Sequence, residues 1–252
     1  MLRFFRVFVG LVALAGLTAC GDDNKATVSG SGGSTNIGAG GDSGVYAPMI
    51  DPADFSTTID NQYLPWPPGM VQKWVEDQTS HITITVTDQT KTVMGVDCVV
   101  VHDELKDETD TVVEDTMDWY AQDKDGNVWY FGEDTTELDA TGKPDTSGSW
   151  EAGVDGAYPG ITMPADAVVG DPYRQEYYKG EAEDWGQIIE VDVSVSVPAG
   201  DYTGCIKTKD WAGLHPTTDV ENKIYCPGVG NVRAEVVEGG AGLEELTDIT
   251  IP

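Results

Sequence analysis

Residues 118–134 read DWYAQDKDGNVWYFGED, and this stretch decides the fold. Two runs rich in aromatic side chains, residues 119–120 and 128–131, flank the polar residues 123–127. Aromatic and β-branched residues favour a pleated, half-buried surface, and the Asp-Gly and Gly-Asn steps supply the positive φ of a tight reversal. The stretch therefore predicts a β-hairpin that turns at residues 123–127.

Further short strands on both sides of this hairpin predict an antiparallel β protein. Apolar and polar residues alternate in 81–87 and again in 189–197, as on a sheet with one buried face. Other strands are expected at 70–76, 96–102, 172–179, 203–211, 219–226, 232–238 and 243–251. Residues 134–170 are polar and rich in glycine and are expected to form a long loop, which is often functional in a compact domain.

The second half of the chain repeats the first, with units of about 63–133 and 162–251. Cys98 corresponds to Cys205, and Gly126-Asn127-Val128 corresponds to Gly230-Asn231-Val232. We therefore expect a mostly β fold with few helices, in which two similar antiparallel units form a curved sheet, a half-barrel or a sandwich.

The first 20 residues have the features of an export signal. Arg3 and Arg6 precede an apolar run over 7–17 that is too short to span a bilayer. The run ends in Leu17-Thr18-Ala19-Cys20, which resembles the lipobox of bacterial lipoproteins. The resemblance implies a signal peptide over 1–19, a lipid on Cys20, and an exported chain anchored on the periplasmic or cell-surface side of a bacterial membrane.

Residues 20–45 follow as a linker rich in glycine and serine, with almost nothing to bury. A flexible chain of this length reaches about 25–30 Å, so it would hold a folded domain just off the membrane. That domain is expected to cover residues 46–252, which is long enough to bury a core of its own.

The charge of the chain excludes one class of partner. It has 14 basic and 44 acidic residues, for a net charge of −30. Nucleic acid is not expected to bind, because no basic surface is available to displace its counterions. Cations, cationic proteins and neutral ligands are compatible with this charge, which can also serve solubility alone.

Three cysteines lie in the expected domain. The midpoint between Cys205 and Cys226 falls between His215 and Pro216, in a turn-like segment. Two antiparallel strands that reverse there place the two sulfurs opposite each other, so we predict a Cys205–Cys226 disulfide. Cys98 is then expected to be a small buried hydrophobic residue.

Turn and strand motifs in the second half support the fold but no activity. They are Val197-Pro198-Ala199-Gly200, Cys205-Ile206-Lys207, Tyr225-Cys226-Pro227-Gly228-Val229-Gly230 and Glu245-Leu246. These motifs resemble those of uncharacterised exported lipoproteins with curved antiparallel sheets, similar in outline to the half-barrels of lipoprotein carriers. Such an analogy implies a fold alone.

One turn is a candidate metal site. Asp123, Asp125 and Asn127 place several oxygens around one reversal, as calcium requires, but the bidentate glutamate of an EF-hand loop is missing. The alternative is a hairpin turn with solvated carboxylates. We therefore expect either no cofactor or weakly bound calcium.

No established catalytic motif occurs in the sequence, so its function remains a choice among three hypotheses. The first is a lipid-anchored binding protein for a small amphiphilic or neutral ligand, with Trp119, Trp150 and Trp185 at the site; the last two lie in loop-like contexts. The second is a carboxylate-dependent hydrolase that uses Glu151 and Asp155. The third is an acidic interaction or inhibitor module. A cavity, a pair of converging acids or a protruding loop would distinguish the three.

Overall fold

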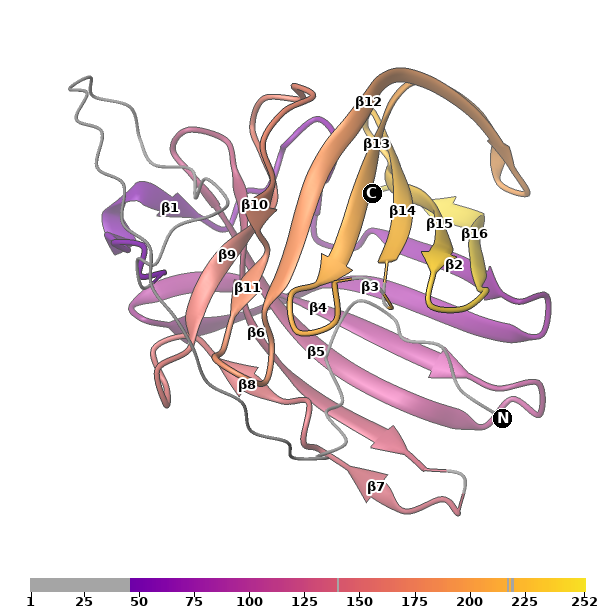
Figure 1. The fold of residues 1–252 in the computed structure, drawn as a ribbon, viewed down its shortest axis with the longest axis horizontal. Coiled ribbons are helices and arrows are strands. Elements are labelled where there is room, and N and C mark those ends of the chain that lie inside the picture. The colour runs from indigo at the N-terminus through magenta and orange to yellow at the C-terminus, as the bar shows by residue number, and fades with distance from the viewer. Residues whose placement is uncertain (1–45, 140, 217, 219) are drawn as a thin grey trace, which may run out of the picture.

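A computed structural model describes residues 46–139, 141–216, 218 and 220–252 (Figure 1). The expected signal peptide, the lipid attachment site at Cys20 and the linker lie outside these residues. The described part is nearly all strand, and its one helical segment is the 3-10 turn η1 (Pro52–Asp54). The prediction of a mostly β fold is confirmed. No helix in the described part of the chain has the length and hydrophobicity needed to cross a membrane.

Sixteen strands form the sheet. They are β1 (Phe55–Ser56), β2 (Val71–Glu76), β3 (Ser80–Val93), β4 (Val96–Lys106), β5 (Val112–Asp123), β6 (Val128–Leu138), β7 (Pro144–Asp145), β8 (Trp150–Glu151), β9 (Tyr158–Met163), β10 (Tyr173–Arg174), β11 (Glu176–Tyr177), β12 (Asp184–Val197), β13 (Gly200–Ala212), β14 (Val220–Cys226), β15 (Gly230–Glu238) and β16 (Leu243–Thr250). All pairings between them are antiparallel.

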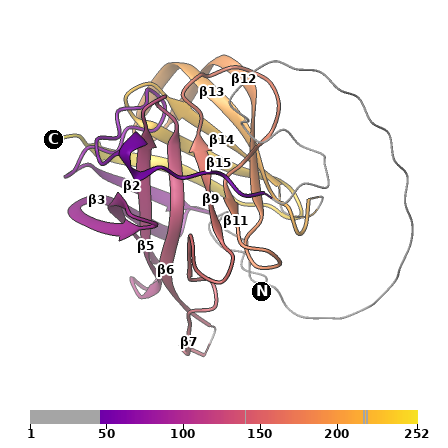
Figure 2. The same ribbon diagram turned by 90° about the vertical axis from the view of Figure 1, so that its left-hand side faces the viewer.

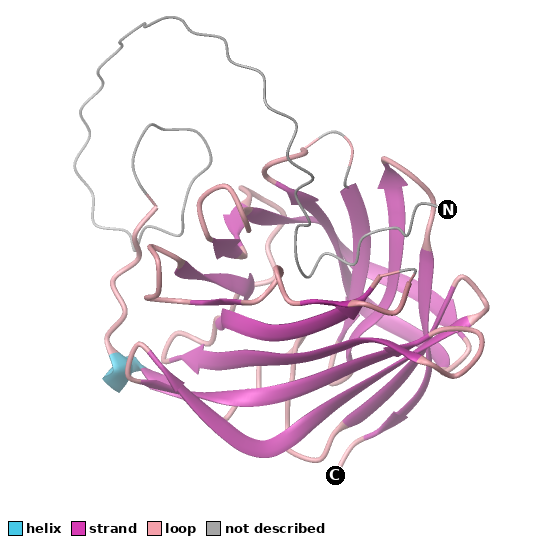
Figure 3. Ribbon diagram, turned by 90° about the horizontal axis from the view of Figure 1, so that it is seen from below, coloured by secondary structure: helices cyan, strands magenta, loops and turns pink. Residues whose placement is uncertain are grey.

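The sheet curves until its two ends almost meet. Its strand order is β10-β12-β13-β14-β15-β16-β2-β3-β4-β5-β6-β9-β11, so β10 and β11 lie at opposite ends. Only Gln175 separates these two strands in the sequence. The backbone amide of Gln175 donates a hydrogen bond to the Asp184 carbonyl at 2.8 Å. On the other side, Gly160 lies so close that a Cβ added there would overlap the Gln175 backbone. The result is a nearly closed, barrel-like sheet, whose curvature is visible in Figures 2 and 3.

Two four-stranded meanders make up most of this sheet, one from β3 to β6 and one from β12 to β15. In Figure 1 the first runs across the lower part of the molecule and the second stands at the upper right. β3 and β12, the first strands of the two meanders, each contain 14 residues. The internal repeat remains a prediction.

The β-hairpin predicted at residues 118–134 is confirmed. β5 pairs with β6, and the chain reverses between Asp123 and Val128 with Gly126 at a φ of +94°. Tyr120 lies opposite Tyr130 across the hairpin, and their rings stack at 5.0 Å between centroids.

The expectation of a long loop over 134–170 is wrong in part. β6 continues to Leu138, and β7, β8 and β9 then pair along its edge. Gly132 lets β8 approach, because it has a φ of +122° and a Cβ there would overlap the backbone of Trp150. Trp150 and Trp185, expected in loops, lie in β8 and β12. Glycine and polar residues at a sheet edge resemble a loop in sequence, because such an edge buries little.

The Cys205–Cys226 disulfide is present, with a Cα–Cα distance of 4.2 Å. It joins β13 to β14 and packs in a small hydrophobic cluster with Trp74, Ile82, Val232 and Leu246. Cys98 is free and buried, and burial raises the pKa of its thiol to about 12. A larger hydrophobic cluster, which includes Tyr120, Tyr130, Phe131 and Met163, forms the main core.

Removing the disulfide should destabilise the protein strongly. A bridge between cysteines 21 positions apart lowers the entropy of the unfolded chain, so the Cys205→Ala, Cys226→Ala double variant should lose about 3 kcal/mol in free energy of unfolding. Urea unfolding followed by tryptophan fluorescence measures this loss. Wild-type protein treated with dithiothreitol serves as the control and should lose a similar amount. Unfolding of the wild type that is insensitive to the reductant would contradict the prediction.

Candidate functional site

The interior of the curved sheet contains an unusual number of buried charged side chains. Seven buried carboxylic acids and one lysine belong to this set among the described residues: Asp103, Asp118, Glu133, Glu176, Asp184, Asp210, Glu221 and Lys223. Alternate residues of a strand point to the same face, so a closed sheet turns half of each strand inward. Here several inward positions are acidic rather than apolar.

A cavity of about 70 Å³ lies inside the sheet, partly open to solvent. Its walls come mainly from strand residues two apart: 72 and 74 of β2, 82 and 84 of β3, 101 and 103 of β4, 118 and 120 of β5, and 221, 223 and 225 of β14. Leu64 and Trp66 of the segment before β2, Thr162, Asn231 and Glu244 complete the lining. We refer to this space as the interior cavity.

The lining of the interior cavity has an apolar part and a charged part. The apolar part includes Leu64, Trp66, Trp74, Ile82, Ile84 and Val101, and the tyrosines Tyr120 and Tyr225 adjoin it. The charged part consists of Asp103, Asp118, Glu221, Glu244 and Lys223, that is, four carboxylic acids and one ammonium. Such a mixed surface fits a small molecule with both an apolar and a polar part.

Lys223 is held in its charged form. Its ammonium lies 3.5 Å from Asp210 Oδ2 and 3.8 Å from Glu221 Oε1. Burial alone would lower the pKa of Lys223, but the carboxylates of Glu221, Asp210 and Glu244 raise it above its ordinary value. Lys223 therefore neutralises part of the negative charge of the surrounding carboxylates.

Three uncharged side chains of the interior cavity have polar atoms that lack a hydrogen-bond partner in the described part of the protein. They are Gln72 Oε1, Trp66 Nε1 and Trp74 Nε1. Gln72 is only 1% exposed, and its side-chain Nε2 donates a hydrogen bond to the Val229 carbonyl at 2.8 Å. Its Oε1 atom accepts no hydrogen bond from the described residues. A buried donor or acceptor without a hydrogen bond destabilises the folded protein by about 1–3 kcal/mol. These three atoms therefore favour a bound molecule or a water as hydrogen-bond partner.

Further acids cluster beside the interior cavity. The Tyr130 hydroxyl donates to Asp118 at 2.8 Å, and Asp118 lies opposite Glu133 across the β5–β6 pairing. Burial raises the pKa of Glu133 well above its usual value, and the neighbouring Asp118 and Glu176 raise it further. Burial, followed by Asp184 and Asp118, does the same for the pKa of Glu176. Glu133 and Glu176 therefore retain their protons to higher pH than solvated glutamates do.

A second hollow, about 350 Å³ in volume, brings together four of the residues predicted from the sequence. Trp119, Trp150, Glu151 and Asp155 all line it. The Glu151 carboxylate already forms an ion pair with the Lys91 ammonium at 2.8 Å. The same ammonium lies 3.7 Å from the centre of the Trp119 ring. The two candidate catalytic acids thus share a hollow, but one of them is neutralised by lysine.

Trp185 lies elsewhere and lines neither hollow. It is opposite Trp211 across the β12–β13 pairing, with ring centroids 6.3 Å apart. The guanidinium of Arg174 lies 4.2 Å from the Trp185 ring. The structure therefore separates Trp185 from the other two candidate ligand-binding tryptophans.

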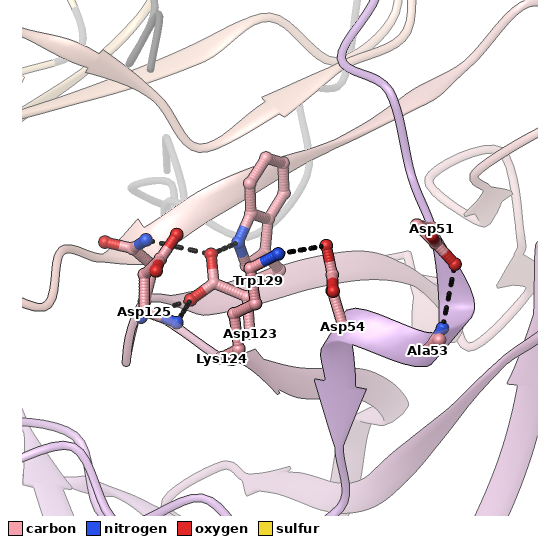
Figure 4. A network of polar contacts seen from close by, with 8 residues as sticks. Asp51, Ala53, Asp54, Asp123, Lys124, Asp125 and Trp129 are labelled. Carbon is pink, nitrogen blue, oxygen red and sulfur yellow. Dashed lines mark hydrogen bonds and ion pairs between the residues drawn. The ribbon is translucent and has the colours of Figure 1, made fainter. Parts of the chain in front are cut away.

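The candidate metal turn is held by a hydrogen-bond network centred on Asp123 (Figure 4). Asp123 accepts hydrogen bonds from the backbone amides of Asp125 and Asn127, the Asn127 side chain and Trp129 Nε1, at 2.8–3.0 Å. Its carboxylate oxygens stabilise the reversal of the hairpin. Within the described ranges, no group of three or more His, Cys, Asp or Glu residues is arranged to hold a metal ion.

The sequence predicted most of the strands that surround the interior cavity, but not which of their side chains line it. Glu221, Lys223 and Tyr225 alternate within one strand, and this is the signal that could have revealed an inward-facing charged row. A charged residue in an alternating strand is normally assigned to the solvent face. The curvature that buries it depends on pairings far apart in the sequence.

Comparison with known proteins adds one structure. A protein of Bacteroides fragilis described as a "putative exported protein with YmcC-like fold" is similar over 75% of this chain and 99% of its own, with 17% identity and a TM-score of 0.43. No protein-family model and no curated protein matches the chain. The assignment of the site therefore rests on the residues of this chain.

The hydrogen bonds to the half-buried Asp123 should contribute measurably to stability. Asp123→Ala removes the acceptor of four hydrogen bonds and should lower the free energy of unfolding by about 2 kcal/mol. Asp125→Ala, at an exposed position in the same turn, is the matched control and should change it by less than about 0.5 kcal/mol. Urea unfolding measures both, and equal losses in the two variants would contradict this account of the turn.

The buried Glu133 should make the protein less stable as the pH rises. Unfolded, Glu133 loses its proton near its ordinary pKa of 4.5, whereas the folded protein retains it to higher pH. Above about pH 4.5 the unfolded state therefore binds fewer protons, and the free energy of unfolding falls by up to about 1.4 kcal/mol per pH unit until the raised pKa is passed.

Glu133→Gln removes this dependence, because glutamine carries no proton to lose. Urea unfolding between pH 4.5 and 8 should give a shallower decline for Glu133→Gln than for the wild type. The exposed Glu238→Gln variant is the control and should keep the wild-type slope. A Glu133→Gln slope equal to that of the wild type would refute the assignment.

Proposed function

We propose that this chain is an exported binding protein, anchored to the membrane by a lipid on Cys20, that holds one small ligand inside its curved sheet. The observation that carries the proposal is the interior cavity, whose lining combines apolar, aromatic and charged side chains. Polar atoms of Gln72, Trp66 and Trp74 lack hydrogen-bond partners among the described residues, and this supports the binding of a molecule there.

The size of the interior cavity limits the ligand. A water molecule occupies about 10–15 Å³ on a comparable measure, so 70 Å³ accommodates about five to seven atoms of that size. Typical pockets for drug-sized ligands measure about 300–1,000 Å³. The cavity therefore favours a compact molecule and does not favour a long acyl chain, so carriage of a whole lipid is a poorer fit.

The N-terminal sequence supports the location. The lipobox Leu17-Thr18-Ala19-Cys20 is followed by the glycine- and serine-rich linker to residue 45 and then by the folded domain. A binding domain on such a linker would meet ligands that diffuse through the periplasm or near the cell surface.

The second hollow, lined by Trp119, Trp150, Glu151 and Asp155, gives less support to a hydrolase. A carboxylate-dependent hydrolase needs one acid to donate a proton and a second carboxylate to attack or to activate water. The Glu151 carboxylate forms an ion pair with the Lys91 ammonium at 2.8 Å, which weakens its case as a catalytic acid. Hydrolysis and acidic capture of a protein partner therefore remain predictions from the sequence.

Filling the interior cavity should abolish binding. Ile84 lines it, and Ile84→Trp would occupy the space, whereas Thr83→Trp places the same bulk at the adjacent position, which does not line the cavity. The full chain and both variants, purified gently from the native host, are compared by native mass spectrometry, with circular dichroism to confirm folding. A co-purifying organic mass should appear with the wild type and Thr83→Trp and be missing from Ile84→Trp. Retention of that mass by folded Ile84→Trp, or no bound mass in any sample, would contradict the proposed site.

A further inference from the structure

We infer, on the basis of the proposed function, that the ligand of the interior cavity is a small uncharged molecule with a hydroxyl group. The inference concerns the chemical class that the uncharged polar atoms of the lining would select. It rests on Gln72 Oε1, Trp66 Nε1 and Trp74 Nε1, which have no hydrogen-bond partner among the described residues.

The three side chains are buried together in the lining. Gln72 and Trp74 are two residues apart in β2, so they share one face of the strand, and they lie opposite Ile84 and Ile82 of β3, which also line the cavity. Trp66 reaches the cavity from the segment before β2. Gln72, Trp74 and Trp66 are 1%, 3% and 7% exposed. A partner for their polar atoms must therefore enter the interior of the sheet.

The Gln72 side chain offers an acceptor, because a neighbour fixes the orientation of its amide. Gln72 Nε2 donates a hydrogen bond to the Val229 carbonyl at 2.8 Å. A flipped amide would place Oε1 against that carbonyl, and two acceptors would then face each other without a proton. Gln72 Oε1 therefore needs a donor from the ligand.

The two indole groups need the opposite partner. An indole Nε1–H donates a hydrogen bond and cannot accept one. The Trp66 ring packs against Tyr120, with 6.1 Å between the ring centroids, and Trp74 packs in the small hydrophobic cluster that contains the disulfide. Together with Gln72 Oε1, these residues call for one donor and two acceptors.

A hydroxyl group provides this combination, since it has one O–H donor and two acceptor lone pairs. An ammonium has no acceptor for the indole N–H groups, and a carboxylate or an ether has no donor for Gln72 Oε1. Water has the same groups as an alcohol, but only the alcohol also buries hydrocarbon against the apolar part of the lining, which includes Leu64, Ile82 and Val101. The cavity should therefore prefer a short alcohol to water and to ions.

A panel of small probes of similar size tests the inference. The full chain in detergent micelles is dialysed until native mass spectrometry shows no co-purifying ligand. It is then titrated with 1-butanol, methyl propyl ether, butylamine and butyrate, and affinities are referred to the free aqueous concentration of each probe. 1-Butanol should bind at least about tenfold more tightly than each of the others, because each of them leaves a buried group without a partner. Equal or tighter binding of any other probe would overturn the inference.

The indole N–H signals in ¹H–¹⁵N NMR spectra locate the binding. 1-Butanol should shift the signals of Trp66 and Trp74, which are assigned by their absence from Trp66→Phe and Trp74→Phe. Trp129 is the internal control, because its Nε1 already donates to Asp123 at 2.8 Å and it does not line the cavity. Binding of 1-butanol that leaves the Trp66 and Trp74 signals in place, or that shifts Trp129 equally, would overturn the inference.

A pair of glutamine variants tests the donor. Gln72→Met removes Oε1, so the preference for 1-butanol over methyl propyl ether should fall from about tenfold to within about twofold. Gln187→Met is the matched control, because Gln187 Nε2 also donates to a backbone carbonyl at 2.8 Å but the residue lies outside the lining. It should keep the tenfold preference. A folded Gln72→Met variant that keeps it as well would contradict the inference, and if this variant does not fold, the indole signals of the wild type decide.

The failure of this inference can be told apart from failure of the proposed function. A co-purifying ligand that Ile84→Trp excludes, together with no preference for 1-butanol, would overturn the hydroxyl ligand and leave the binding protein intact. No co-purifying ligand and no binding of any probe would overturn both.

Discussion

Closure of the sheet at Gln175 is the constraint on which the rest of the structure depends. The two ends of the strand order meet at this residue, where the chain passes directly from β10 to β11. The meeting requires Gly160, whose missing side chain leaves room for the Gln175 backbone, and it is fixed by the hydrogen bond from the Gln175 amide to Asp184. Without this closure the inward faces of the strands would be open to water.

The closed interior has direct electrostatic consequences. Carboxylic acids that would be solvated on an open sheet become buried, so the pKa values of Glu133 and Glu176 rise well above their usual range. A buried lysine is stabilised as an ammonium by Glu221, Asp210 and Glu244. The same enclosure leaves a small space lined by apolar and charged side chains. The burial of these side chains and the buried polar atoms without a hydrogen-bond partner in the described part of the protein both arise from one feature of the topology.

A large part of the fold could be predicted from local sequence. The hairpin at residues 118–134 followed from its aromatic runs and its Asp-Gly-Asn turn, and the disulfide followed from the symmetric placement of Cys205 and Cys226 about a reversal. Both depend on neighbours in sequence or on a single strand pairing. Strands at the edge, such as β7 and β8, were missed because each is only two residues long, which is too short for an alternating pattern.

The candidate site could not be predicted in the same way. Its lining comes from the segment before β2 and from eight strands, β2, β3, β4, β5, β9, β14, β15 and β16, so it exists only after closure. Trp119, Trp150, Glu151 and Asp155 do converge, but on another hollow, where Lys91 neutralises Glu151. The inward direction of Glu221 and Lys223 is set by the curvature of the whole sheet, which no local pattern records.

The central claim is that the interior cavity binds one small molecule, and a crystal structure of the full chain purified gently from its native host tests it most directly. The account predicts density for a compact organic molecule inside the sheet, against Trp66 and Trp74 and within hydrogen-bond distance of Gln72 Oε1. A cavity that contains only water, or a molecule bound only elsewhere on the surface, would contradict it.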